Sequence, residues 1–78
     1  MNNTIKFLIS KNYTGERLDI YLSKKIRKFT RSYIKKLIEG EQVKINKNLV
    51  TSPSTKIKMN DKISINIYHF SIFQKYIL

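Results

Sequence analysis

The sequence predicts a small α+β domain in which two packed basic helices are followed by a mostly antiparallel hairpin sheet. Apolar residues recur at helical spacing in two segments, about 16–28 and 30–40, and alternate with polar residues in the short segments that follow. At 78 residues the chain has the size of one domain. A domain this small buries only about 60% of the surface of its unfolded chain, so we expect one modest core and no roomy catalytic cleft.

The segment before the helices predicts a half-buried strand. Residues 4–10 alternate between apolar and polar side chains, with Leu8 as the one apolar residue out of phase. We therefore assign residues 1–14 to a strand and a loop, with the strand as a candidate addition to the sheet.

The first helix is predicted over residues 16–28. Glu16 and Asp19 lie in its first turn, where the positive end of the helix dipole favours carboxylates. Its apolar residues share one face: Leu18, Tyr21, Leu22, Ile26 and Phe29.

The second helix is predicted to begin at Thr30 and to end at Gly40. The Thr30 hydroxyl can accept a backbone N–H of the first turn, and Gly40 is expected to adopt the left-handed conformation that ends helices. Only Phe29 and Thr30 separate the two helices, so we expect the chain to turn sharply there and the helices to pack together.

The rest of the chain predicts short strands and tight turns. Asn46-Lys47-Asn48 is typical of a hairpin turn, because Asn tolerates positive φ. The expected elements are strands at 42–46 and 49–51, a loop at Pro53, a short strand or bridge at 56–58, a turn at 59–62 and an alternating strand at 63–67.

The balance of charge indicates a polyanionic partner. The formal net charge is +11, from 16 Lys and Arg against 5 Asp and Glu. AT-rich coding would explain abundant lysine, but it would not explain so few carboxylates. Lys and Arg that neutralise phosphates release condensed counterions, which favours binding to nucleic acid.

Composition also excludes several kinds of site. The chain has no Cys and one His, His69, so a cysteine nucleophile, a disulfide and a multi-histidine metal cluster are excluded. We expect no metal and no cofactor. No signal peptide and no membrane-spanning run is recognisable, so we expect a monomeric cytoplasmic protein without a membrane partner.

Basic residues on both helices are the candidates for binding. The main ones are Arg17, Arg31 and Lys35, because arginines and lysines from two packed helices can converge on one face. The secondary candidates are Lys24, Lys28, Ser32, Lys36 and Lys44. For any single lysine, a solvated surface position is an equally good interpretation. Tyr21 and Tyr33 are candidates for base stacking, although their spacing favours packing at the edge of the core.

Six short motifs occur in a fixed order between residues 15 and 67. They are Arg17-Leu18-Asp19, Thr30-Arg31-Ser32, Leu37-Ile38, Val43-Lys44-Ile45-Asn46, Pro53-Ser54 and Asn60-Asp61-Lys62-Ile63. In this order they resemble the S-four RNA-binding domain, also called the alpha-L motif. Within this family, the residues of these motifs are most similar to the N-terminal domain of RluA/RluD-type ribosomal RNA pseudouridine synthases. The resemblance implies an S-four-like fold over residues 15–67, with RNA contacts on the two helices.

Two positions depart from the family pattern. Lys47 stands where the hairpin turn usually has Gly, and Asn60 stands where Gly usually precedes Asp. Asn replaces Gly easily at such turns. Lys does so less easily, because the position favours positive φ, so we expect a looser or longer turn there.

Asp19 belongs to a tripeptide that resembles the catalytic motif of such synthases. In this family, however, Arg17-Leu18-Asp19 belongs to the first helix of the RNA-binding domain, where Asp19 can pair with a nearby cation. No second acid or base is nearby, so Asp19 has no partner for acid–base or covalent catalysis. We expect no catalytic residue and no enzymatic activity from this chain by itself.

The leading hypothesis is a module that docks on structured RNA, above all ribosomal RNA, through its basic two-helix face. One alternative is the truncated RNA-binding part of a pseudouridine synthase, because the sequence ends at Leu78 without a catalytic domain. A second is a stand-alone factor that binds transfer RNA or the large ribosomal subunit. A third is a membrane-surface or protein-docking module built on the aromatic tail, residues 68–78. That tail has three open interpretations: a linker remnant, an extra element packed on the core, or a docking segment.

Overall fold

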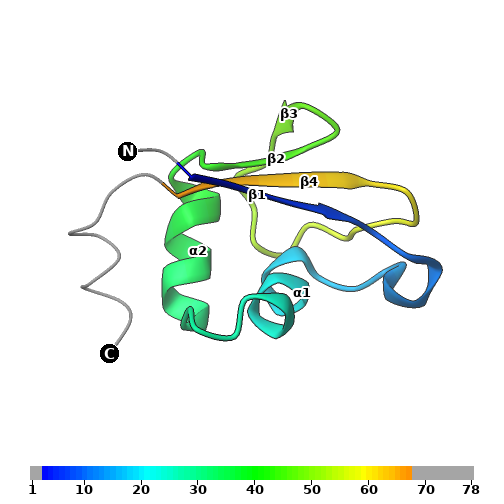
Figure 1. Cartoon of the computed structure of the whole chain (residues 1–78), viewed down its shortest axis with the longest axis horizontal. Coiled ribbons are helices and arrows are strands. Elements are labelled where there is room, and N and C mark those ends of the chain that lie inside the picture. Colours follow the sequence, from blue (N-terminus) through cyan, green and yellow to red (C-terminus); the bar gives the residue numbers. More distant parts are fainter. Residues whose placement is uncertain (1–2, 68–78) are drawn as a thin grey trace.

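The structure, a computed structural model, describes residues 3–67 as a four-stranded sheet with two helices on one side (Figure 1). The elements are β1 (Asn3–Leu8), a 3-10 turn η1 (Lys11–Tyr13), α1 (Leu18–Lys25), α2 (Arg31–Glu39), β2 (Val43–Ile45), β3 (Asn48–Leu49) and β4 (Lys62–Ile67). This arrangement confirms the predicted α+β class. The predictions for the tail, residues 68–78, lie outside the described residues.

The sheet has the strand order β1-β4-β2-β3, and all neighbouring strands are antiparallel. The last strand, β4, therefore lies between the first strand and the hairpin. The predicted N-terminal strand is present and pairs along its whole length with β4. The predicted strand or bridge at 56–58 is an isolated bridge between Lys56 and Arg17.

The core lies between the sheet and the helices. The apolar face of the sheet consists of alternate residues of β1, β2 and β4, and the helices add the apolar stripes that their spacing predicted. Leu8 is 64% exposed, as expected for the residue out of phase in β1. The buried core residues include Ile9, Leu18, Leu22, Ile34, Ile38, Val43, Ile57, Ile63 and Ile65.

The β2–β3 hairpin is tighter than predicted. The strand pairing leaves only Asn46 and Lys47 in the turn, and both have positive φ, 53° and 72°. Two positive φ values are typical of a type I′ turn, whose twist matches that of the strands. The Asn46 amide braces the turn, because its oxygen accepts the Lys62 N–H at 3.0 Å and its nitrogen donates to Asp61 at 3.0 Å. The prediction of a looser or longer turn was wrong, since these bonds offset the roughly 1–2 kcal/mol cost of a left-handed lysine.

The first helix is shorter than predicted at both ends. Its first N–H groups, on Leu18 and Asp19, donate to the carbonyls of Thr55 (2.8 Å) and Pro53 (3.1 Å). The loop after β3 therefore caps α1, and Glu16 lies outside the helix. At the other end the chain leaves the helix at Ile26, where φ is −113° and ψ is 78°.

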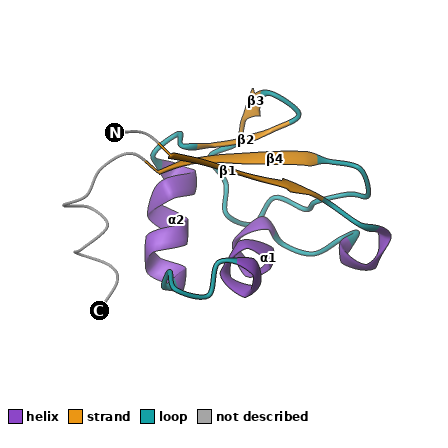
Figure 2. Ribbon diagram, in the orientation of Figure 1, coloured by secondary structure: helices purple, strands orange, loops and turns teal. Residues whose placement is uncertain are grey.

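The connection between the helices is accordingly longer than the two residues predicted. It spans residues 26–30 and still carries core side chains, because Ile26 and Phe29 are buried. The Phe29 ring meets the Tyr33 ring edge-on, with centroids 4.8 Å apart. The helices pack together as expected, and this buried connection joins them (Figure 2).

The second helix begins and ends where predicted, but a different residue adopts the left-handed conformation after it. The Thr30 hydroxyl accepts the Tyr33 N–H at 3.1 Å, as predicted for a helix cap. Gly40 follows the last helical residue with a φ of −85°, whereas Glu41 has a φ of 66°. The Glu41 and Gln42 N–H groups then donate to the carbonyls of residues 38 and 37, the two bonds of a Schellman motif. The prediction that Gly40 is the left-handed residue was wrong, because that conformation falls one residue later.

This geometry predicts opposite effects for two substitutions at the end of α2. A Cβ on Gly40 would lie 2.9 Å from the Lys36 carbonyl oxygen, so we expect Gly40→Ala to lower the free energy of unfolding by about 1–3 kcal/mol. Glu41→Gly should raise it by about 0.5–1 kcal/mol, because glycine adopts positive φ without steric cost. Urea unfolding followed by circular dichroism measures both. Stabilisation by Gly40→Ala would contradict this assignment.

Candidate nucleic-acid interface

A buried carboxylate joins two arginines at the start of the helices. The Arg17 Nε and Nη2 atoms donate to the two Asp19 carboxylate oxygens at 3.1 and 3.0 Å, and Arg31 Nη2 lies 3.7 Å from Oδ2. The Asp19 side chain is 0% exposed, whereas those of Arg17 and Arg31 are 40% and 57% exposed. We call Arg17 and Arg31 the arginine pair. It presents two cations to solvent beside one buried carboxylate, with Arg17 hydrogen-bonded to that carboxylate and Arg31 in an ion pair with it.

The fold brings these three side chains together from two elements. Arg17 immediately precedes α1, Asp19 lies in its first turn, and Arg31 is the first residue of α2. The Asp19 oxygen that takes the Arg17 Nε also accepts the Ile20 N–H at 2.8 Å, which fixes the carboxylate. Both main arginine candidates therefore lie at one point, and Asp19 pairs with cations as expected.

The exposed side of α2 continues from the arginine pair. Ser32, Lys35 and Lys36 are all exposed, whereas the opposite side of the helix is buried in the core. Arg31 and Lys35 are one turn apart, as are Ser32 and Lys36, so they form two rows along the helix. We call the arginine pair together with Ser32, Lys35 and Lys36 the helix face. It carries four cations from five side chains.

The remaining candidates on the first helix and its connection have neighbours of their own. The Lys24 ammonium pairs with Glu16 at 2.6 Å, which neutralises part of its charge. The Lys28 ammonium lies 5.8 Å from the centre of the Phe29 ring. Lys25, which the sequence did not single out, lies over the rings of Tyr13 and Tyr21 at 4.6 and 5.7 Å.

Lys44 is not part of the helix face. It lies on β2 between two buried residues and is exposed, so its side chain projects from the sheet surface that faces away from the helices. The candidate residues that lie on one face are therefore those of α2 and the start of α1, and Lys44 is not among them.

The two tyrosine candidates are both buried. Tyr21 is 2% exposed and Tyr33 is 1% exposed, so neither ring is presented to a base. Burial raises the pKa of Tyr21 above its ordinary value, and the nearby Lys25 ammonium partly opposes this rise. Tyr21 is therefore a neutral core phenol at physiological pH, and the helix face carries no stacking platform from these two residues.

The acidic side chains of residues 3–67 form no metal-binding cluster, and both oxygens of Asp19 are bonded. Within this range no three His, Asp or Glu side chains lie close enough together to hold a metal ion. Asp19 has both oxygens occupied by arginine and backbone N–H groups, which suits anchoring. In the same part of the chain, neither helix has the length and apolar composition that a membrane crossing requires.

One feature of the site escaped sequence reasoning, namely that Asp19 joins two different helices. The sequence predicted only that Asp19 pairs with a nearby cation, whereas Arg31 is twelve positions beyond Asp19 and reaches it through the fold. One sequence signal could have indicated this contact. Arg31 is an exposed Arg at the first position of the helix that follows the Arg17-Leu18-Asp19 segment.

Comparison with known proteins identifies the family of this domain. Residues 16–63 match the family model of the S4 domain. The chain is 43% identical over 53 residues to ribosomal large subunit pseudouridine synthase D of Buchnera aphidicola, covering 68% of this chain and 17% of that protein. It is 36% identical over 52 residues to an uncharacterized RNA pseudouridine synthase of Aquifex aeolicus, covering 67% of this chain and 16% of that protein. The chain therefore spans about a sixth of the length of these curated relatives.

Proposed function

The chain belongs to the S4 domain family, and on that premise we propose that it docks on structured ribosomal RNA through the helix face. The observation that carries this proposal is the arginine pair held by Asp19, with Arg17 and Arg31 half-exposed around a buried carboxylate. Arginine presents a planar fork of N–H donors that matches the oxygens of a phosphate.

The mechanism is electrostatic docking on the RNA backbone. Double-helical RNA has a deep, narrow major groove that side chains cannot read, so phosphate positions and shape dominate its recognition. The helix face suits this task because its cations lie along one side of α2 and its tyrosine neighbours are buried. Transfer RNA offers the same backbone chemistry and serves as a comparison ligand. With ribosomal RNA as the partner, the proposed place of action is the cytoplasm. We propose that the chain binds as a monomer and that its target is the large ribosomal subunit.

The chain binds and does not catalyse by itself. The matched region of the relatives covers only about a sixth of their length, and both relatives carry pseudouridine synthase in their names. We infer that this domain supplies RNA docking for uridine modification, with the chemistry performed by a catalytic domain outside the matched region. Adding a separately purified synthase catalytic domain and measuring pseudouridine formation tests this coupling. Formation unaffected by the chain would contradict it.

Docking through phosphate contacts predicts a steep salt dependence. Each phosphate neutralised in a duplex contributes about 0.9 to the slope of log affinity against log salt, so the four cations of the helix face predict a slope of roughly −3 to −4. Fluorescence anisotropy of labelled large-subunit RNA fragments across a salt series measures it. A slope near zero, or binding absent at low salt, would overturn the proposed function.

A further inference from the structure

The sheet surface that faces away from the helices carries a second group of lysines. Lys6 on β1 and Lys44 on β2 both pair with Ser64 on β4, so they flank it on either side. Two inter-strand spacings separate their Cα atoms by about 10 Å. Lys62 lies two residues before Ser64 on β4, and Lys47 lies in the hairpin turn beside it. We call Lys6, Lys44, Lys47 and Lys62 the lysine surface. All four are exposed, and among residues 3–67 none is in an ion pair.

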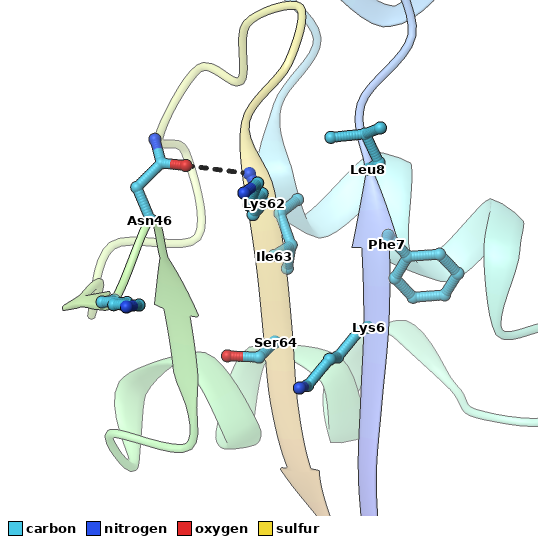
Figure 3. Close-up of a pocket in the computed structure, with 8 residues that line it drawn as sticks. Lys6, Phe7, Leu8, Asn46, Lys62, Ile63 and Ser64 are labelled. Atoms are coloured by element: carbon cyan, nitrogen blue, oxygen red, sulfur yellow. Dashed lines mark hydrogen bonds between the residues drawn. The ribbon is translucent and has the colours of Figure 1, made fainter.

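The lysine surface borders two adjoining hollows. Three of the lysines line the larger one, together with Leu8, Asn46 and Ser64 (Figure 3). Lys44 lines the smaller one, which Ser64 also borders. Because Ser64 lies in both, the two hollows form one surface across β1, β4 and β2.

Carboxylates do little to neutralise this surface. No acidic side chain lines the larger hollow, and the smaller one contains Glu41 only. Asp61 lies nearby in sequence but is 6% exposed, and its oxygens accept hydrogen bonds from Asn46 and from the Lys58 N–H. Like charges gathered on one surface repel one another unless an anion lies between them.

The shape of the surface favours a backbone over a base. The one aromatic residue in its lining, Phe7, packs its ring edge-on against Tyr21 at 5.8 Å, so it does not serve as a stacking platform. Besides the apolar residues Leu8 and Ile63, the lining carries lysine ammonium groups and the Ser64 hydroxyl, which can donate hydrogen bonds to phosphate oxygens.

We propose that the lysine surface binds the phosphate backbone of a second RNA segment while the helix face holds the first. The helix face belongs to the helices that cover one side of the sheet, and the lysine surface lies on the other side of the sheet (Figure 1). One copy of the chain can therefore bridge two helices of a folded RNA. The inference goes beyond docking by the helix face, because it assigns a separate surface and a separate RNA segment.

Bridging is tested with the full chain and two short RNA duplexes, one labelled with a donor fluorophore and the other with an acceptor. Energy transfer should appear when the chain is added and should disappear at a large excess of chain, when each duplex binds its own copy. The double variant Lys6→Gln/Lys62→Gln should lower the affinity for the second duplex roughly tenfold or more, because it no longer neutralises two of the phosphates. Its affinity for a single duplex should change by less than about twofold at the same salt.

The matched control is Lys11→Gln/Lys58→Gln, which removes the same charge from two exposed lysines that line neither hollow. Equal transfer by the two double variants would overturn the proposal, as would single-duplex binding by the native chain without any transfer. Failure of the native chain to bind even one duplex would instead overturn the proposed function, and bridging with it. Binding to phosphatidylserine vesicles that depends on Lys6 and Lys62, while RNA transfer does not, would assign the surface to a membrane and overturn the RNA proposal.

Discussion

Replacing Arg31 by Glu should lower the affinity for structured RNA by roughly tenfold to a hundredfold near physiological salt. Arg31 is the more exposed member of the arginine pair and opens the row of cations along α2. The substitution removes a cation and places an anion where a phosphate would lie. The slope of log affinity against log salt should also become shallower by roughly one to two, because each neutralised phosphate contributes about 0.9 to it.

The matched control is Lys11→Glu, which changes the charge of the chain equally. Lys11 is exposed in η1, at the opposite end of the molecule from α2 (Figure 1). Because Arg31→Glu also brings a carboxylate close to Asp19, Arg31→Gln should be measured beside it, with circular dichroism to verify that each variant folds. Equal reductions in affinity for Arg31→Glu and Lys11→Glu would show that net charge, and not the helix face, determines binding.

The parts of the fold that were predicted correctly are those with local causes. The second helix begins after Thr30 because the Thr30 hydroxyl accepts the Tyr33 N–H, which has no backbone acceptor within the helix. Both residues lie within four positions of sequence, so the pattern can be recognised locally. The alternation in β1 placed Leu8 outside the core for an equally local reason, the period of two along a strand. Motif order then identified the fold family, which residues 16–63 confirm.

The predictions that failed depend on partners distant in sequence. The first helix starts late because carbonyls of Pro53 and Thr55, more than thirty residues away, satisfy its first N–H groups. Lys47 adopts positive φ because the Asn46 amide is bonded to residues at the start of β4. Helical periodicity and turn propensity carry no information about such contacts, so they gave a longer helix and a looser turn.

The assignment of the site divides in the same way. The exposed residues of α2 followed from helical periodicity, since alternation of buried and exposed pairs is visible in the sequence. Lys44 lies on the other surface because Val43 and Ile45 on either side of it face the core, but only the tertiary fold shows that both helices cover that same side of the sheet. The roles of all these residues in RNA binding remain predictions for the binding experiments.

Asp19→Asn should weaken RNA binding although it makes the chain more positive. If the helix face acted only through its net charge, removing a carboxylate would strengthen the attraction for phosphate. Asp19 instead holds both guanidinium groups in place, with Arg17 bonded to both of its oxygens. An amide can accept a hydrogen bond on one atom only, so the pair should loosen and the affinity should fall by roughly fivefold to tenfold.

Stability and binding have to be separated in this variant. Exchange of the buried carboxylate should lower the free energy of unfolding by about 1–2 kcal/mol, because the two arginines can regain water while one charge-assisted bond is broken. The native-like circular dichroism spectrum should persist, and binding is measured well below the melting temperature of the variant. Glu16→Gln is the matched control, since it removes the same charge beside Lys24 and leaves the arginine pair intact. Tighter binding by both variants would mean that the arginines act as independent charges, whereas weaker binding by Asp19→Asn alone identifies the buried carboxylate as the residue that positions them.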